Sequence, residues 1–198
     1  MSIGNDIVDL ADLETREQGL HPRFDERVFR PDERALLERS DSGHVLRWAL
    51  WAAKESAYKA EKRLDPEVVF SPKQFAVELS ALPHAGGPGV AEGRVVHRGH
   101  VLGLQVHVDR TCLHAVATRP RGAGARLLWS VDRAVSDPGA AVRRLAATAI
   151  ASALDLDADG IQVARRPPVA LHRGRSLMTD LSLSHHGRFV AFACALNP

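Results

Sequence analysis

The most informative segment of this chain is Trp51-Ala-Ala-Lys54-Glu55-Ser56-Ala57-Tyr58-Lys59. The apolar residues in and before it follow a helical spacing, and on a helix Glu55 and Lys59 lie four residues apart on the face that also holds Trp51. One interpretation is an exposed pair that stabilises the helix by about 0.2–0.5 kcal/mol. The other is a carboxylate among apolar neighbours, which needs a cation, a metal or a hydrogen-bond donor.

Two other polar segments interrupt runs that otherwise resemble strands. In Gly4-Asn5-Asp6 a carboxylate stands within a strand, where Asp is disfavoured. It either begins a turn or offers a ligand to Mg²⁺, which proteins hold with one or two carboxylates plus substrate phosphates. Near the C-terminus, residues 182–188 (Ser-Leu-Ser-His-His-Gly-Arg) gather hydroxyl, imidazole and guanidinium groups around a glycine. That set suits a phosphate, and equally a polar hairpin turn.

Composition excludes several classes of protein. The 198 residues, 45% of them hydrophobic, suffice for one large domain or two small ones, and exclude a disordered or collagen-like chain. No apolar run approaches the roughly 18–20 residues that cross a bilayer, and the N-terminus lacks a secretory signal pattern, so we expect a soluble cytoplasmic protein with no membrane partner. The arginines form no basic stripe with interleaved aromatic residues, which argues against nucleic acid. Cys112 and Cys194 fit small buried residues better than a disulfide or a metal site.

The charged residues are unevenly distributed. Only four of the 26 basic side chains are Lys, and three of these four lie within residues 54–62. Residues 1–120 carry 18 acidic and 16 basic side chains, whereas residues 121–198 carry 6 and 10. An acidic first part facing a basic second part suits an anion that a metal bridges to the protein, although differences this small are common.

Periodicity predicts strands and helices in two successive sets, which indicates an α+β fold. The first set consists of strands at 2–10, 74–80, 101–108 and 112–118, and of helices from Pro31 to about Arg39 and from a Ser42 cap to about Lys62. Loops are expected at 83–92 and, as a linker, at 120–124. The second set consists of a strand at 126–132, a helix from 137 or 138 to about 154, a loop at 164–168, and a hairpin of 181–184 and 189–196. We therefore expect two related halves, 1–120 and 121–198.

In this order, the three polar segments resemble the 4'-phosphopantetheinyl transferase superfamily. Its G-x-D pattern matches Gly4-Asn5-Asp6, its W-x-x-K-E-[SA]-x-x-K pattern matches Trp51 to Lys59, and its S-[LI]-S-H pattern matches Ser182 to His185. Residues 28–33 (Val-Phe-Arg-Pro-Asp-Glu) also look like the family's F-x-x-x-E helix start. The resemblance implies the α+β fold of that superfamily.

The order of the motifs differs from that of the long members of the family. Surfactin-type enzymes are pseudodimers in which S-H precedes G-x-D, whereas short holo-acyl-carrier-protein synthases begin with G-x-D. Here residues 143–196 look like the surfactin-type N-terminal half and residues 1–120 like its C-terminal half. The resemblance thus implies a circularly permuted pseudodimer, a monomer with one complete set of motifs at the interface between its halves.

The resemblance also implies roles for particular residues. Asp6 and Glu55 would bind Mg²⁺, and Lys59 with Lys54 would neutralise the phosphates of coenzyme A. His185 with Ser184 would hold the 3'-phosphate. The residues that could assist them are Arg143 or Arg144, and Arg165 or Arg166.

The implied reaction transfers the phosphopantetheine arm of coenzyme A. A serine of an apo acyl carrier protein, or of a peptidyl or aryl carrier domain, attacks the β-phosphorus and 3',5'-ADP leaves. Deprotonation of that serine falls to Glu55 or to a water that Glu55 orients. No residue in the sequence identifies the carrier; Arg23, Arg27 and Arg30 are candidates for contact with it.

Three positions depart from the surfactin-type pattern. Val8 stands where surfactin-type enzymes have a second acid, whereas the short synthases also have Val at this position. Residues 166–168 (Arg-Pro-Pro) replace a G-K-P loop and lack its lysine, which Arg166 replaces only approximately. His186 stands where a small polar residue is usual. An alternative function is therefore a non-catalytic homologue that binds coenzyme A or a carrier protein.

Overall fold

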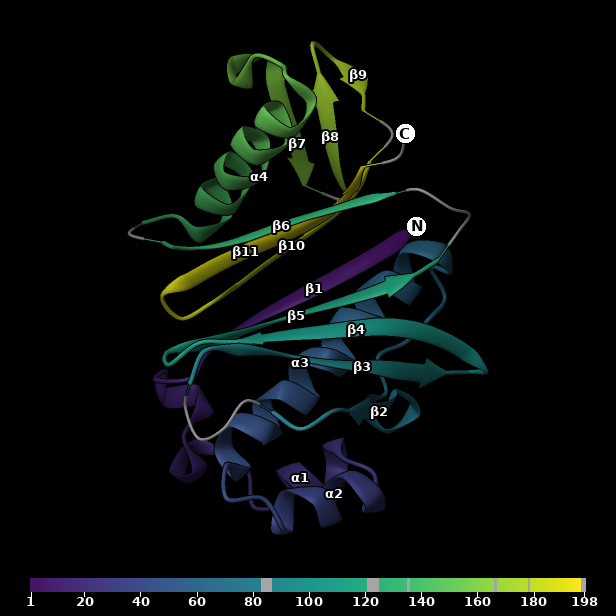
Figure 1. The fold of residues 1–198 in the computed structure, drawn as a ribbon, viewed down its shortest axis with the longest axis vertical. Coiled ribbons are helices and arrows are strands. Elements are labelled where there is room, and N and C mark those ends of the chain that lie inside the picture. Colours follow the sequence, from purple (N-terminus) through teal and green to yellow (C-terminus); the bar gives the residue numbers. More distant parts are fainter. Residues whose placement is uncertain (83–86, 121–124, 135, 166, 178, 197–198) are drawn as a thin grey trace.

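The computed structural model describes residues 1–82, 87–120, 125–134, 136–165, 167–177 and 179–196. It confirms a mixed α+β fold, in which antiparallel sheets are covered by helices (Figure 1).

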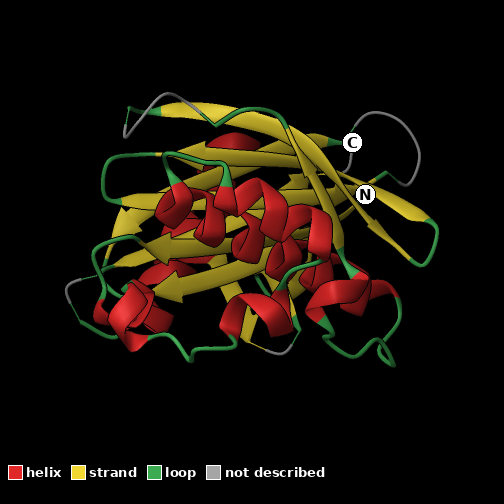
Figure 2. Ribbon diagram, turned by 90° about the horizontal axis from the view of Figure 1, so that it is seen from below, coloured by secondary structure: helices red, strands yellow, loops and turns green. Residues whose placement is uncertain are grey.

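The first half of the chain forms a five-stranded antiparallel sheet. Its strands, in spatial order, are β1 (Ser2–Asp9), β5 (Cys112–Arg119), β4 (His100–Val108), β3 (Gly89–His97) and β2 (Ala76–Leu79). The helices of this half are α1 (Phe24–Val28), α2 (Pro31–Glu38) and α3 (Gly43–Leu64), with 3-10 turns η1 (Leu13–Thr15), η2 (Glu17–Gly19) and η3 (Pro72–Gln74). Seen from below, the helices lie in front of the strands, and α3 packs on β1 and β5 (Figure 2).

The second half forms a three-stranded antiparallel sheet and a smaller one. The strands of the first, in spatial order, are β10 (Asp180–His186), β11 (Phe189–Leu196) and β6 (Arg126–Arg133). The smaller sheet contains β7 (Ile161–Arg165), β8 (Pro168–His172) and β9 (Arg175–Ser176), after the 3-10 turn η4 (Ala158–Gly160). Helix α4 (Pro138–Leu154) contacts β11, β6, β7 and β10.

The two halves share a chain path. In the first, β1 leads to α3 and the final strand β5 returns to pair antiparallel with β1, with β4 on its other side. In the second, β6 leads to α4 and the final strand β11 returns to pair antiparallel with β6, with β10 on its other side. The order β1-β5-β4 therefore corresponds to β6-β11-β10.

Strand β1 joins the halves because its side chains alternate between two partners. On one face Gly4 lies so close to α3 that a Cβ there would be 2.0 Å from the Ser56 carbonyl oxygen, which only glycine tolerates. On the other face Ile3 and Ile7 pack against residues of β11, among them Ala193 and Ala191. The edge strands β1 and β10 lie beside each other where the sheets meet.

Most predicted elements are confirmed to within a few residues, but four expectations are wrong. Residues 89–92, predicted as loop, begin β3. The predicted loop at 164–168 is too long, because residues 164 and 165 belong to β7 and residue 168 begins β8. The strand predicted at 74–80 shrinks to β2 because η3 takes its start. Ser42 precedes α3, yet its side chain makes no capping hydrogen bond. Residues 83–86 of the first loop and 121–124 of the expected linker lie outside the described residues.

Both cysteines are buried free thiols, as expected, and burial is the main cause that raises the pKa of Cys112 to about 11 and that of Cys194 to about 12. Within the described ranges, every helix is too short or too polar to span a membrane.

Candidate functional site

Asp6, Glu55 and Lys59 meet where β1 packs on α3. The Lys59 ammonium lies 2.7 Å from Asp6 Oδ1 and donates a second hydrogen bond, 3.0 Å long, to the Asn5 carbonyl oxygen. Burial raises the pKa of the Glu55 carboxyl; the positive charge of Lys59 opposes this shift, and the negative charge of Asp6 adds to it. The predicted juxtaposition of strand and helix is present, with two carboxylates and one ammonium group in a half-buried position.

A cavity of about 490 Å³ opens beside this cluster, between the two halves. The first half lines it with residues of α3 and its C-terminal side: Tyr58, Lys59, Lys62, Arg63 and Pro66. The second half lines it with Pro167, Pro168, Ser182 and Leu183. Pro167 and Pro168, which the sequence analysis compared with a G-K-P loop, therefore share a cavity with Lys59.

Arg63 connects the two halves of the chain at this cavity. Its guanidinium group donates to the carbonyl oxygens of Pro168, at 3.5 Å, and of Leu181, and lies 4.0 Å from Asp180 Oδ1. These contacts fix β8 and β10 against α3. Sequence reasoning missed Arg63, since its partners are more than 100 residues away in the chain.

Both serines of the hairpin motif accept hydrogen bonds from Asn5, and Ser182 also lines the cavity. The Asn5 backbone N–H donates to Ser182 Oγ at 3.0 Å, and the Asn5 side-chain amide donates to Ser184 Oγ at 2.8 Å. Ser184 is only 6% exposed. The Ser184 hydroxyl therefore connects β10 to β1. Because it is buried and already hydrogen-bonded, it is not available for the expected contact with a phosphate.

His185 is placed differently from Ser184. Successive strand residues point to opposite faces, so its ring lies on the other face of β10, and it is exposed. Throughout the described ranges, we find no hydrogen bond or ion pair that occupies this ring. His185 is therefore available to a ligand at the edge of the sheet.

Lys54 has a structural position, contrary to the expectation that it neutralises phosphate. Its side chain is fully buried, and its ammonium donates to Glu33 Oε1 at 2.7 Å and to the carbonyl oxygens of Phe75 at 2.7 Å and Pro72 at 3.2 Å. All three donors of the ammonium are used. Glu33, in the F-x-x-x-E segment, also accepts from the backbone N–H of Val77 and Arg30.

Three of the expected assisting arginines, Arg143, Arg144 and Arg165, are not among the described residues that line the cavity. Arg143 and Arg165 both act electrostatically on Asp137, the N-cap of α4, whose pKa is lowered chiefly by the backbone N–H of Ala140. Arg144 is exposed on α4. Arg166 lies outside the described residues.

Asp9 and Arg188 form a second link between the halves that the sequence analysis missed. The Arg188 guanidinium donates two 2.7 Å hydrogen bonds to the Asp9 carboxylate, and its backbone N–H donates a third, 3.0 Å long. These bonds hold the pKa of Asp9 well below its ordinary value, although burial opposes them. Gly187 lets the turn approach, because a Cβ there would lie 2.7 Å from Asp9 Oδ2.

This link predicts a pH dependence of stability. A carboxyl whose pKa is lowered by folding stabilises the protein above its unfolded pKa and loses that contribution as the pH falls through the folded value. We expect Asp9→Asn to lower the urea midpoint of unfolding at pH 7, and the difference from wild type to shrink below about pH 4, near the ordinary value of 3.8. An unchanged difference between pH 7 and pH 3 would exclude this role.

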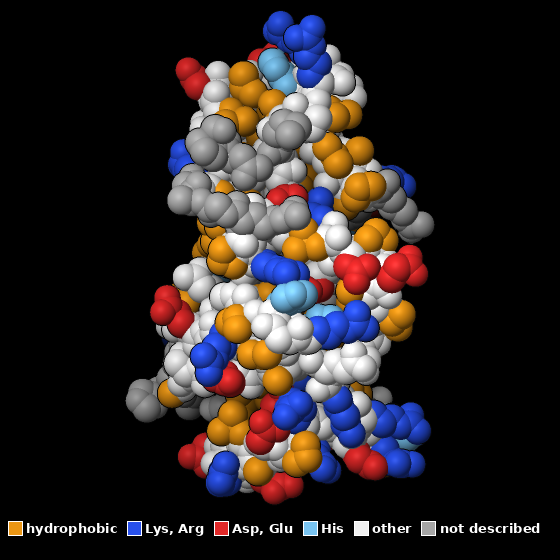
Figure 3. All heavy atoms as spheres, turned by 90° about the vertical axis from the view of Figure 1, so that its right-hand side faces the viewer, with side chains coloured by type: hydrophobic (Ala, Val, Ile, Leu, Met, Phe, Trp, Pro, Cys, Tyr) orange, Lys and Arg blue, Asp and Glu red, His pale blue; other side chains and the backbone are white. Residues whose placement is uncertain are grey.

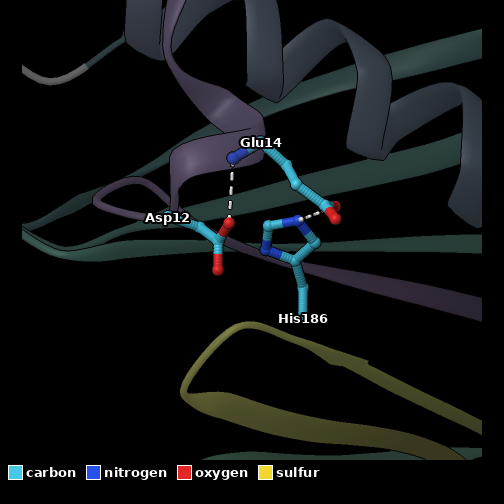
Figure 4. Close-up of side chains that lie close together, drawn as sticks. All are labelled: Asp12, Glu14 and His186. Carbon is cyan, nitrogen blue, oxygen red and sulfur yellow. Dashed lines mark hydrogen bonds and ion pairs between the residues drawn. The ribbon is translucent and has the colours of Figure 1, made fainter. Parts of the chain in front are cut away.

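His186 belongs to the same link, together with Asp12 and Glu14, whose ligand atoms lie within 4.8 Å of one another (Figure 4). The Asp9 backbone N–H donates to His186 Nδ1 at 3.1 Å, so the neutral ring carries its proton on Nε2, which faces Glu14 at 3.8 Å. Asp12 Oδ1 accepts from the Glu14 backbone N–H as the cap of η1. A ring nitrogen that bears a proton does not ligate a metal, and this group fits a metal poorly.

The chain to which these site residues belong was compared with models of known protein families. Residues 2–85 match the family model described as the 4'-phosphopantetheinyl transferase superfamily. The matched range contains Asp6, Glu55 and Lys59, whereas the hairpin with His185 lies outside it. None of the curated proteins matches the chain.

Proposed function

The chain belongs to the 4'-phosphopantetheinyl transferase superfamily, and on this basis we propose that it transfers the phosphopantetheine arm of coenzyme A to a serine of an apo carrier protein. The acceptor is an acyl carrier protein or a peptidyl or aryl carrier domain, Mg²⁺ is the cofactor, and 3',5'-ADP is the second product. The observation that carries this proposal is the cluster of Asp6, Glu55 and Lys59, of which Lys59 lines a cavity between the two halves.

The donor set fits a divalent cation. Two carboxylates share a half-buried position with one ammonium group, and burial together with the negative charge of Asp6 raises the pKa of the Glu55 carboxyl. Oxygen ligands of this kind suit Mg²⁺. When bound, the ion would neutralise charge on the pyrophosphate of coenzyme A and on the departing 3',5'-ADP.

The remaining steps fall to residues of the chain. Lys59, which already lines the cavity, places a positive charge beside the phosphates, and Lys62 and Arg63 extend that charge along α3. The carrier serine loses its proton to Glu55 or to a water that Glu55 orients, and its oxygen forms the new bond to the β-phosphorus. The bond between that phosphorus and the bridging oxygen breaks, and the oxygen leaves with 3',5'-ADP. His185 holds the 3'-phosphate at the exposed edge of β10.

We also infer that the chain is a permuted pseudodimer and acts as a monomer. The corresponding orders β1-β5-β4 and β6-β11-β10 support a duplication. Strand β6, which corresponds to β1, contains no G-x-D pattern, so the chain has one such motif in this pair of strands. Residues from opposite ends of the sequence are neighbours: the Met1 amino group lies 3.9 Å from Asp180, which pairs with Ala195. A swapped order of halves requires such proximity.

The carrier surface is proposed to include the end of the molecule formed by α1 and α2. Lys and Arg side chains gather at the lower end of the molecule in Figure 3, mixed with acidic ones, at the level of these helices in Figure 1. Arg23 and Arg30 are exposed or half-exposed there, although each has an acidic partner, Glu26 and Asp32 respectively. The acidic side chains of a carrier helix would compete with Glu26 and Asp32 for these two arginines.

Release of 3',5'-ADP tests the proposal against the non-catalytic alternative. Coenzyme A is incubated with the protein, Mg²⁺ and a panel of apo carriers, and the nucleotide is measured by chromatography. Release that depends on both Mg²⁺ and a carrier is the expected result. Binding of coenzyme A without release, for every carrier tested, would favour a homologue that binds and does not catalyse.

His185→Ala is expected to weaken coenzyme A binding by roughly tenfold or more, since hydrogen bonds to charged groups contribute about 1.5–3 kcal/mol. The fold should be unaffected, because the ring is exposed. Calorimetric titration with coenzyme A and with 3'-dephospho-coenzyme A separates the contribution of the 3'-phosphate: the variant should lose affinity only for the former. Equal losses for both ligands would remove His185 from the 3'-phosphate site.

A further inference from the structure

Asn5, the middle residue of the G-x-D motif, is a polar residue in an apolar row. On the face of β1 that packs against the second half, Asn5 stands between Ile3 and Ile7, and each of the three residues is at most 1% exposed. Burial of an amide is less favourable than burial of an aliphatic side chain unless the amide gains hydrogen bonds. Packing between the halves therefore does not by itself account for Asn5.

The backbone of Asn5 joins the two sides of the cavity beside Lys59. Its carbonyl oxygen accepts a 3.0 Å hydrogen bond from the Lys59 ammonium, on α3, and its N–H donates a 3.0 Å hydrogen bond to Ser182 Oγ, on β10. Lys59 and Ser182 both line this cavity. A shift of β1 along β10 would therefore move the two sides of the cavity relative to each other.

The side chain of Asn5 determines how β1 lies against β10. Its amide donates one hydrogen to Ser184 Oγ, at 2.8 Å, and the other to His114 Nε2 on β5, at 3.0 Å. Burial is the main cause that lowers the pKa of His114 to about 3, so the ring is neutral at pH 7 and accepts this bond. Asn5 reaches both Ser182 and Ser184 in one register of the two strands only.

Stability does not explain this network of side chains. Asn5 Oδ1 and His114 Nδ1 are buried and have no hydrogen-bond partner among the described residues. A buried polar atom without a partner costs free energy, whereas apolar groups in place of all the partners are often neutral or stabilising. The best-attested use of buried polar contacts of this kind is to fix a register.

We propose that Asn5 and His114 are positioning residues for the transferase site. Their contacts hold β1 in register with β10, and this register aligns the reaction centre of the first half with the part of the coenzyme A site that lies on β10. The inference rests on the function proposed above. Neither side chain touches the substrates, because Asn5 is fully buried and His114 is 1% exposed.

The test is a triple variant that replaces the polar groups of the network together: Asn5→Val, His114→Leu and Ser184→Ala. We expect its urea midpoint of unfolding to equal or exceed that of wild type, because no side chain of the network is left without its partner. Coenzyme A affinity, measured by calorimetric titration, and the rate of transfer should each fall at least about tenfold, since small displacements of reacting groups cost this much or more. Unchanged affinity and rate, or a markedly lower midpoint, would overturn the proposal, because the network would then serve the fold and not the site.

Two further variants separate positioning from packing. Ile7→Val, on the same face of β1, removes a methyl group and keeps the network, so it should lower the urea midpoint and leave affinity and rate within about twofold of wild type. His114→Gln offers the Asn5 amide an acceptor oxygen and should retain affinity, whereas His114→Leu should lose it. Equal effects of Gln and Leu would contradict the role of His114.

Amide hydrogen exchange at residue 5 needs no substrate, so it distinguishes this inference from the proposed function. The N–H that donates to Ser182 Oγ should exchange at least about tenfold faster in the triple variant than in wild type, with the slowest amides of α3 unchanged. Unchanged exchange at residue 5 would overturn the positioning role. Faster exchange in the variant, together with a wild type that transfers nothing to any carrier, would support the register and count against the proposed function alone.

Discussion

Replacing Glu55 by Gln is expected to lower the rate of phosphopantetheine transfer by roughly 10²–10³-fold or more, a loss typical of removing one electrostatic group from a reaction centre. The substitution removes a charge and keeps the volume. The fold should be at least as stable as before, because burial and the neighbouring charge of Asp6 both disfavour the charged form of Glu55. The measurement is the initial rate of transfer at saturating coenzyme A, with unfolding in urea as the check on stability.

A matched carboxylate serves as control. Glu67 is exposed just beyond the end of α3, and its side chain makes no hydrogen bond or ion pair with the described part of the chain. Glu67→Gln should leave the rate within about twofold, as surface substitutions usually do. Full activity of Glu55→Gln, or equal losses in both variants, would show that Glu55 is not part of the reaction centre.

Lys54→Met is expected to cost about 3–5 kcal/mol of unfolding free energy, the usual cost of removing one partner from a buried ion pair. The variant leaves the Glu33 carboxylate 3% exposed and bound only to the backbone N–H groups of Arg30 and Val77. The coenzyme is not involved in this effect, since the ammonium group of Lys54 is fully buried. Urea unfolding gives the free energy.

A double variant separates loss of packing from loss of the pair. Adding Glu33→Gln to Lys54→Met removes the unpaired charge, so it should restore part of the lost stability. Lys73→Met, at an exposed lysine, should change stability by less than about 0.5 kcal/mol. A cost below about 1 kcal/mol for Lys54→Met, together with weakened coenzyme A binding, would instead support the phosphate-binding role that the sequence suggested.

The sequence predicted the neighbourhood of Asp6 and Glu55 better than the surroundings of these two residues. Asp6 and Glu55 were placed together because one interrupts a strand and the other marks a polar face on a helix, and both signals are local. Lys54 stands next to Glu55 in the sequence but points about 100° away from it around the helix. Its burial depends on Glu33, 21 residues earlier, which no local pattern reveals.

The second half shows the same limit. Period-two alternation predicts that Ser184 and His185 point to opposite faces of a strand. It does not say which face meets β1, and that depends on the Asn5 amide, 179 residues away. The pair of Asp9 and Arg188 is equally distant in sequence, so His186 gained an explanation only from the structure. Strand β3 was missed because its first residues follow a stretch rich in Gly and Pro.

The most direct test of the central claim is the intact mass of apo carrier proteins after incubation with the protein, coenzyme A and Mg²⁺. Parallel samples contain EDTA in place of Mg²⁺, or the Glu55→Gln variant in place of wild type. We predict that at least one carrier gains the mass of a single phosphopantetheine arm with wild type and Mg²⁺, and that this gain is lost in both controls. A gain that persists in EDTA or with Glu55→Gln would contradict the assignment of Asp6 and Glu55 as the metal-binding reaction centre.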